Sequence, residues 1–355
     1  MPKIQLISHK GEKECLDFFE HFFTSDKKVL FIGTLGFNDA CLYFPGLMPR
    51  SSCIDYLFLV EQRPEVPEVL HRTAQRNKKI LEGTIVADSL FFAEIRIVAE
   101  DTANVAGRNA TLECSAWLKK GYTDVVVDAT TMSRGVCFPI VRQAFEYSKL
   151  SGGPRTHVVI ADRTVSSLDT RSMSSDTPQY MHGFQADMDT DSVKNALKLW
   201  LPQLSENNLP SLERIFRHLQ AEEVSPILPF PAANPRRGDD LLREFQGPIL
   251  SDWDVNLLDL IYAHESDPTD VFETIKRIHL GRGEALSCSK DSPPRTILSP
   301  AGSKMGSLGM LFAAIELDLP VIYSETMGYQ CGQTEVPPVS AALPDCMWHA
   351  WLRPV

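Results

Sequence analysis

Short apolar runs rich in β-branched residues alternate along the N-terminal half of the chain with longer segments of helical periodicity. The runs predict strands at residues 29–32, 56–61, 94–99, 124–128 and 157–161. The segments predict helices around residues 16–23 and at 66–81, 105–120 and 136–147. Strands that alternate with helices of this length form βαβ crossovers. Residues 1–165 are therefore predicted to fold as a Rossmann-like domain with a mainly parallel sheet.

A polar segment at residues 166–192 interrupts this pattern and predicts a surface linker or a mobile lid. Beyond it, helical patterns are found at residues 193–201, 212–221, 239–245, 268–278 and 304–317. Strand-like runs are found at 225–230, 257–263, 296–298 and 321–323. Residues 193–355 are thus predicted to form a second Rossmann-like α/β domain. Its aromatic tail, residues 347–352, is expected to pack on a core or a partner.

The composition narrows the classes of protein that fit. The 355 residues carry a net charge of -11, which provides no overall basic field for binding extended duplex nucleic acid. The eight cysteines are scattered and form no C-x-x-C pair, and the N-terminus shows no leader pattern. We therefore expect a cytoplasmic protein with no metal site of cysteine type. No apolar run of about eighteen residues predicts a membrane span.

The candidate chemistry lies where the predicted strands end, because ligands of parallel α/β sheets bind outside the carboxyl ends of the strands. Gly33 and Thr34 end the first strand and could approach a ligand, although a plain glycine turn explains them equally. The spacing Gly33–Gly36 does not match G-x-G-x-x-G. Glu61 ends the second strand and could accept a ribose hydroxyl or pair with Arg63.

Four ionisable residues near strand ends are candidate catalytic groups. Asp101 could orient water, a ribose or a metal after the third strand, or cap the next helix. Asp128 ends the fourth strand of the first half. His264 and Glu265 follow a strand of the second half and could act as acid and base, or serve as hydrogen-bonded structural residues.

Two loops carry the strongest signal, because each combines hydroxyls and one cation at the start of a helix. The first supplies Thr130, Thr131, Ser133 and Arg134, and the second supplies Gly302, Ser303 and Lys304. Helix N-termini of this kind bind phosphates and other anions. A cation in the first helical turn is unfavourable against the helix dipole unless an anion joins it. Both loops therefore predict anion binding.

Two family resemblances follow from these loops. Asp128, Thr130 and Thr131 resemble the diphosphoribosyl-binding loop of phosphoribosyltransferases, although three residues separate the threonines from Gly135. Asp128, Thr130 and Arg134 are also similar to the D-x-T-x-G-x-K-like element of CARF domains, the Rossmann-like sensors of cyclic oligonucleotides in prokaryotic immunity. The run from Gly302 to Met305 is similar to a Gly-Thr-Lys-Met-type turn of these sensors. The CARF resemblance implies a dimeric sensor that acts in antiviral defence.

The sequence leaves three functions open. Walker A, G-x-S-x-G, H-E-x-x-H and kinase motifs are absent from the sequence, which favours a sensor that binds a nucleotide-type ligand and signals to a partner chain or a homodimer. The alternatives are a nucleotide-processing enzyme, such as a phosphoribosyl or ribosyl transferase or a phosphodiesterase, and a scaffold subunit without catalysis. No cofactor is identified by any of these patterns.

Overall fold

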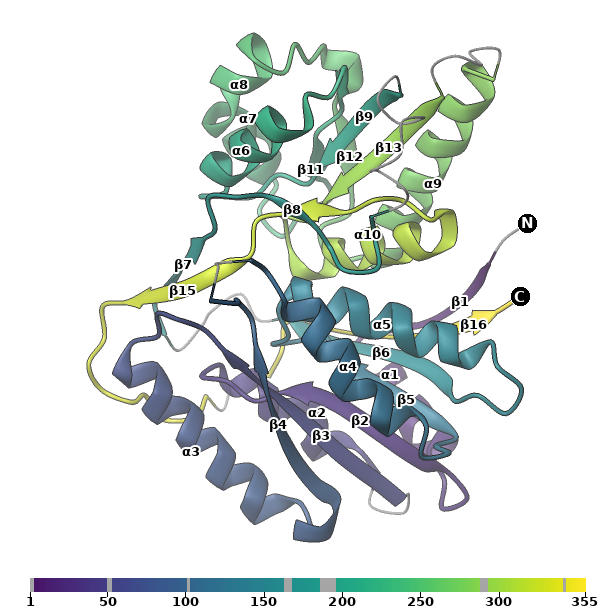
Figure 1. Ribbon diagram of the computed structural model, residues 1–355, viewed down its shortest axis with the longest axis vertical. Helices are drawn as coiled ribbons and strands as arrows, with labels where there is room; N and C mark the ends of the chain where they lie inside the picture. Colours follow the sequence, from purple (N-terminus) through teal and green to yellow (C-terminus); the bar gives the residue numbers. More distant parts are fainter. Residues whose placement is uncertain are drawn as a thin grey trace. The chain divides into compact units, whose positions relative to one another are not determined.

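The structure is a computed structural model that describes residues 3–49, 53–100, 103–162, 168–185, 196–287, 293–340 and 343–355. The chain forms two compact units (Figure 1). Unit 1 consists of Met1–Ser174 and Thr326–Val355, and unit 2 consists of Ser175–Glu325. Unit 2 is therefore an insertion between two segments of unit 1.

Within its described residues, unit 1 contains a seven-stranded sheet with the order β1-β16-β6-β5-β2-β3-β4. The strands are β1 (Ile4–Lys10), β2 (Lys28–Thr34), β3 (Cys53–Gln62), β4 (Leu90–Arg96), β5 (Asp124–Asp128), β6 (Arg155–Asp162) and β16 (Cys346–Pro354). Strands β2 to β6 are parallel, whereas β16 is antiparallel to β1 and β6. Counted along the chain, the parallel strands follow the Rossmann order 3-2-1-4-5.

The helices of unit 1 cover a sheet whose central strands are buried on both sides. These helices are α1 (Glu12–Phe22), η1 (Asp39–Leu42), α2 (Tyr43–Leu47), α3 (Glu68–Thr84), η2 (Ala87–Ser89), α4 (Ala106–Leu118) and α5 (Arg134–Ser148). All residues of β5 are buried, as expected for a parallel strand between two layers of helices. An aromatic core joins α1 and α2 to Phe31 and Phe58 on one face of the sheet. Helices α4 and α5 lie side by side (Figure 1).

Unit 2 repeats this strand order with shorter strands. They are β8 (Gln179–Tyr180), β9 (Leu197–Pro202), β10 (Glu223–Val224), β11 (Ile227–Pro229), β12 (Ile261–Ala263), β13 (Pro294–Ser299) and β14 (Ile322–Tyr323). Parallel ladders join β10, β9 and β13, and also β11 and β12. Single bridges, Gln203–Ile227 and Leu298–Val321, connect these ladders to each other and to the segment before β14. With β10 and β11 counted as one interrupted strand, the order is again 3-2-1-4-5.

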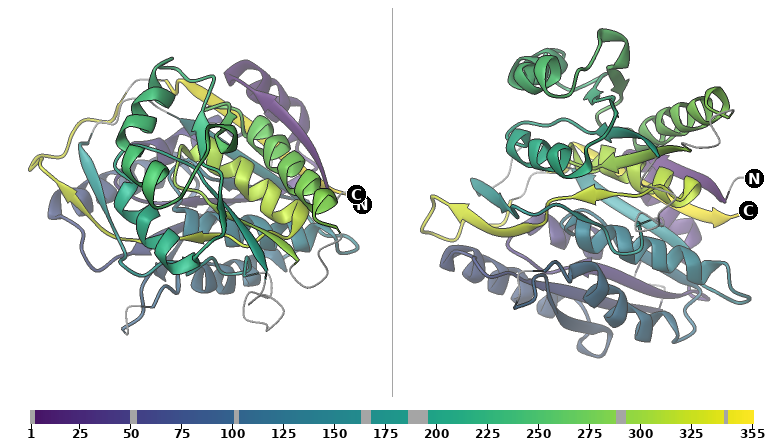
Figure 2. Two further views of the ribbon diagram at one scale, coloured as in Figure 1. Left: turned by 90° about the horizontal axis from the view of Figure 1, so that it is seen from above. Right: turned by 45° about the horizontal axis from the view of Figure 1, so that its top comes forward.

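The helices of unit 2 are α6 (Leu209–Leu219), α7 (Arg237–Glu244), α8 (Gln246–Ser251), η4 (Leu257–Asp259), α9 (Pro268–Ala285) and α10 (Lys304–Leu317). Helices α9 and α10 lie side by side (Figure 2). The buried Trp200 of β9 belongs to a core that includes Leu212 of α6 and Phe245. The predicted α/β class, with mainly parallel sheets flanked by helices, is confirmed in both units.

Three segments differ from the prediction. Residues 193–201 were expected to be helical, yet their described part contains the start of β9. The tail was assigned to the second half, yet β16 pairs with β1 and β6 in unit 1 (Figure 2). The predicted linker, residues 166–192, contains β7 (Thr170–Ser174) and β8 in its described part. Strand β7 pairs with β15 (Thr326–Cys331), and β8 pairs with β14. In each case pairing with a distant segment overrides the local pattern.

Candidate functional site

The switch point of unit 1 lies between β2 and β5, where the strand order reverses direction. Ligands of Rossmann-like sheets bind at this point, outside the carboxyl ends of the two strands. The loops after β2 and β5 meet there, because the Thr131 hydroxyl donates a hydrogen bond to the carbonyl oxygen of Thr34 at 3.3 Å. The structure thus brings together Thr34 and Thr131, which the sequence placed in the separate loops after β2 and β5.

Two buried hydroxyls at the switch point have no hydrogen-bond partner among the described residues: Thr34 Oγ1 and Ser133 Oγ. Thr34 is only 6% exposed. It points to the face of the sheet opposite Phe31, because side chains alternate along a strand. Ser133 is the N-cap residue of α5, but its hydroxyl makes no capping hydrogen bond. The N-terminus of α5 therefore lacks the side-chain cap that serine usually provides.

A carboxylate from the neighbouring strand lies at the same helix end. Glu61 Oε1 accepts a hydrogen bond from the backbone N–H of Ser133 at 3.0 Å. Glu61 Oε2 lies 2.5 Å from Arg63 Nη2, and the two side chains are 10% and 2% exposed. Of the two roles proposed for Glu61, the structure shows the ion pair. Its position is favourable, because a helix N-terminus stabilises negative charge.

Other candidates in unit 1 shape the loop. Asp128 Oδ1 accepts the backbone N–H of Thr130 at 2.9 Å, and Thr130 Oγ1 accepts that of Ala161 at 3.0 Å. Both side chains are buried. A Cβ atom on Gly33 would lie 3.1 Å from ring atoms of Phe31 and Phe58, so core packing accounts for this glycine. Arg134 is the first residue of α5.

The switch point of unit 2 lies between β9 and β13 and contains a glutamine side chain. Gln203 follows β9, is 7% exposed, and its Oε1 has no hydrogen-bond partner among the described residues. A Cβ atom on either Gly302 or Gly306 would overlap the Gln203 side chain. Ser303 Oγ accepts the backbone N–H of Gly306 at 3.0 Å and donates to the Glu265 carbonyl oxygen at 2.9 Å. Ser303 is the N-cap of α10, and its hydroxyl makes the capping hydrogen bond. Lys304 is the first residue of that helix.

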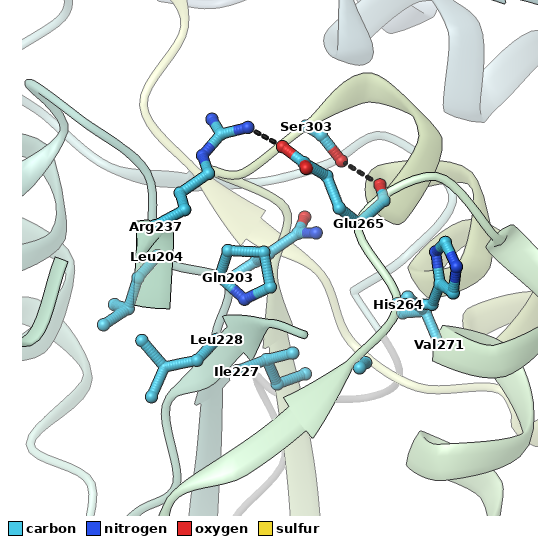
Figure 3. A pocket seen from close by; sticks show the side chains of 11 residues that line it. Gln203, Leu204, Ile227, Leu228, Arg237, His264, Glu265, Val271 and Ser303 are labelled. Carbon is cyan, nitrogen blue, oxygen red and sulfur yellow. Dashed lines mark hydrogen bonds and ion pairs between the residues drawn. The ribbon is translucent and has the colours of Figure 1, made fainter. Parts of the chain in front are cut away.

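A pocket lies beside Gln203 in unit 2 (Figure 3). Its volume is about 280 Å³ with the open solvent at its mouth included. Arg237 and Glu265 point toward one another and form an ion pair at this pocket (Figure 3). Arg237 also binds both carboxylate oxygens of Glu206, at 2.9 and 2.8 Å. Burial alone would raise the pKa of Glu206, but the hydrogen bonds from Arg237 and the backbone lower it below its usual value.

The structure gives His264 and Glu265 structural contacts. His264 Nδ1 accepts the backbone N–H of Ser266 at 3.2 Å, and its ring points away from Arg237 and Gln203 (Figure 3). Glu265 Oε2 accepts the backbone N–H of Ala233 at 2.9 Å. These two candidates belong to unit 2, whereas Asp128 belongs to unit 1.

Asp101 lies outside the described residues. Among the residues that are described, no group of three or more His, Cys, Asp or Glu side chains is arranged to hold a metal ion. In the same part of the chain, no helix combines the length and apolar character needed to cross a bilayer.

Sequence reasoning missed Gln203, because the segment before it has helical periodicity and gave no strand end to inspect. The pairing of Arg237 with Glu206 and Glu265 was also missed. Its signal was weak, since Glu206 lies 31 residues away along the chain.

Comparison with known proteins adds little to this geometry. No protein-family model and no curated protein matches the chain. Among solved structures, a universal stress protein from Pseudomonas aeruginosa UCBPP-PA14 matches with 10% identity and a TM-score of 0.25. The match covers 85% of this chain and 95% of that chain. A likeness this low carries no argument, so the Rossmann-like description rests on the strand order of the two units.

Proposed function

We propose that the protein is a regulatory protein that binds a nucleotide-type anionic ligand at the switch point of unit 1. The observation that carries this proposal is the pair of buried hydroxyls of Thr34 and Ser133, which have no partner among the described residues. A buried hydroxyl without a hydrogen bond costs about 1–3 kcal/mol. A ligand that accepts hydrogen bonds at this edge would remove that cost, and phosphate oxygens are strong acceptors.

The surrounding groups suit an anion. Helix α5 begins at Arg134, directly after Ser133, so the positive end of its dipole and a guanidinium belong to the same short segment. The Thr131 hydroxyl joins the two loops of the site through its hydrogen bond to the Thr34 carbonyl oxygen. In this proposal Asp128, Thr130 and Gly33 hold the loop and strand in shape and do not contact the ligand.

The output of the proposed sensor is a signal to a partner chain or a second copy. Support comes from the CARF resemblance of Asp128, Thr130 and Arg134 and of the segment Gly302, Ser303 and Lys304. The latter segment is the proposed second binding loop, where a ligand would have to displace the Gln203 amide. A role in antiviral defence and a cytoplasmic location belong to the same proposal, and the free cysteines of the described residues suit a reducing compartment.

A binding screen tests this function. The purified chain is titrated with mononucleotides, NAD, phosphoribosyl diphosphate and linear and cyclic oligonucleotides, and every ligand is analysed for chemical change afterwards. Recovery of an unchanged ligand supports the sensor. A cleaved or transferred ligand supports the enzyme alternative, with a phosphoribosyl or ribosyl transfer or a phosphodiester cleavage as its reaction.

Thr34→Val and Ser133→Ala locate the site. Each variant should weaken binding of the ligand found in the screen by about 1–3 kcal/mol, because one hydrogen bond to a charged acceptor is lost. Thr156→Val is the matched control: Thr156 Oγ1 is also buried without a described partner, but it lies near the start of β6. This control should leave affinity unchanged. Equal affinity in all three variants would exclude the switch point as the binding site.

A further inference from the structure

Three histidines and one aspartate of unit 1 form one hydrogen-bonded line across four neighbouring strands. His9 Nδ1 lies 2.9 Å from His349 Nδ1, and His349 Nε2 lies 3.0 Å from His157 Nδ1. His157 Nε2 lies 3.2 Å from Asp124 Oδ1. The line runs from β1 through β16 and β6 to β5, which are adjacent in the sheet. It joins both terminal strands of the chain to the parallel strands of the sheet.

The carboxylate at the end of the line is ionised. Asp124 is fully buried and accepts two hydrogen bonds from Arg155, at 2.7 and 2.8 Å, and one from Thr123 at 2.7 Å. Burial alone would raise the pKa of Asp124, but the hydrogen bonds from His157, Arg155 and Thr123 outweigh it and lower that pKa. The carboxylate therefore acts only as an acceptor.

This acceptor fixes where each neutral ring holds its proton. His157 must donate from Nε2 to Asp124, so its Nδ1 accepts from His349 Nε2. His349 Nδ1 then accepts from His9 Nδ1. The two central rings use both nitrogens along the line, so the three histidines do not converge on one point as metal ligands would. The arrangement is a chain of neutral donors and acceptors.

The surroundings of the line disfavour added charge. His157 and His349 are fully buried, and aromatic rings enclose them. These rings are Phe18, Phe19, Phe22, Phe23 and Trp351. Burial lowers the pKa of His157, and it holds the pKa of His349 well below the ordinary value of 6.5.

The charged groups that face the line are few among the described residues. On α1, the carboxylate of Glu14 faces His9 and partly offsets the lowering of its pKa by burial. On β5 and β6, Asp124 and Arg155 face His157 with opposite signs. Lys27 lies over the ring of Phe22, 5.9 Å from its centroid. Asp124 is already paired with Arg155, so it has little capacity to balance protons added to the line.

We propose that the histidine line is a pH-responsive latch, which fastens β1 and β16 to unit 1 while the rings are neutral and loosens them when the rings take up protons. The latch goes beyond the proposed ligand binding and does not depend on it. Below pH 6.5 the unfolded histidines bind protons that the folded rings do not. The latch is therefore fully formed above pH 6.5 and weakens as the pH falls below it.

Hydrogen exchange of backbone amides tests the latch in the intact chain, at about pH 7.5 and about pH 5.5, with each rate corrected for intrinsic exchange. Protection of β1 and β16 should fall about tenfold or more relative to β2 and β3, because about pH 5.5 is one unit below the ordinary histidine pKa of 6.5 and each unit corresponds to a factor of ten. His349→Gln and His9→Gln should each reduce this selective loss. His71→Gln, at an exposed position of α3, should leave it unchanged.

Two results would overturn the latch. One is a wild-type chain in which β1 and β16 lose no more protection than β2 and β3. The other is an identical selective loss of protection in wild type and in His9→Gln. Because His9 lies at the partly exposed end of the line, this variant tests the latch even if His349→Gln fails to fold. Nitrogen chemical shifts give an independent reading: neutral His157 and His349 should both carry the proton on Nε2, and an Nδ1 proton on His157 would contradict the line.

Discussion

The two switch points share a local pattern, a serine N-cap followed by a basic residue, but they differ in how the serine is used. In unit 2, Ser303 caps α10 and also bonds to the carbonyl of Glu265. In unit 1, Ser133 has a buried hydroxyl without a described partner, and its backbone N–H bonds to Glu61. The same pattern can close a helix end or leave hydroxyls for a ligand. Contacts from distant parts of the chain make the difference.

The side chains that enter the two switch points differ in charge. Glu61 brings a carboxylate held by Arg63, whereas Gln203 brings a neutral amide surrounded by Gly302 and Gly306. Competition with an anionic ligand is thus electrostatic in unit 1 and mainly steric in unit 2. Four experiments test this contrast.

The largest expected effect comes from Arg63→Met. It removes the partner of a carboxylate whose side chain is 10% exposed, and breaking a buried pair in this way costs about 3–5 kcal/mol. The free energy of unfolding in urea measures the loss. Replacing Glu61 by Met as well should restore most of it. The control Arg243→Met breaks a pair whose arginine is 75% exposed and should change stability by less than about 1 kcal/mol. Equal effects of the two arginine variants would contradict a structural role for the Glu61 pair.

Gly306→Ala should destabilise unit 2 by about 1–3 kcal/mol, because its Cβ overlaps the Gln203 side chain. Adding Gln203→Ala should recover part of this loss, and a double-mutant cycle measures the coupling. Gly283→Ala is the control, since a Cβ there meets no atom within 4 Å and alanine favours the helix. Purely additive losses would show that Gln203 does not fill this site.

Replacing each N-cap serine by alanine compares the N-termini of α5 and α10 directly. Ser303→Ala should cost about 1 kcal/mol of stability, because a used N-cap is lost. Ser133→Ala should cost nothing or stabilise the chain slightly, since its hydroxyl has no described partner. Thermal unfolding of the two variants, measured side by side, makes the comparison. An equal loss in both would remove the contrast between the switch points.

The smallest effect is expected for Glu61→Gln, which removes negative charge at the start of α5 while keeping an acceptor for Ser133. The affinity for inorganic pyrophosphate should rise about twofold to fivefold, since a charge at a helix terminus contributes about 0.3–1 kcal/mol. Calorimetric titration measures it. Weaker binding of a nucleotide, with pyrophosphate unaffected, would instead indicate that Glu61 contacts the ribose.

Local patterns predicted much of the fold. Strand β5 and helix α10 begin and end where their apolar runs do. Strand β9 was taken for a helix, because the apolar residues around Trp200 also fit a helical pattern and the run is too short to decide between the two. Strand β16 is locally clear as an aromatic segment, but nothing in its own residues specifies that it pairs with β6, nearly two hundred positions earlier.

The candidate site was predicted to a similar extent. Strand ends located Thr34 and Ser133, because ligands and polar loops gather there in every parallel sheet. Whether a serine hydroxyl finds a hydrogen-bond partner depends on residues elsewhere in the chain. The difference between Ser133 and Ser303 could therefore not be predicted from the sequences of the two loops. The histidine line could not be predicted for the same reason, since His9 and His349 are 340 positions apart and share no motif.

The place of β16 also determines when unit 1 can be completed during synthesis. Until β16 leaves the ribosome, β1 has no neighbour in the sheet and β6 has an unpaired edge. Unit 2, a continuous segment, can be finished while the unit that begins the chain still waits for its last strand. The nascent protein therefore carries an exposed strand edge from the synthesis of β6 until that of β16, and such edges attract chaperones and aggregation partners.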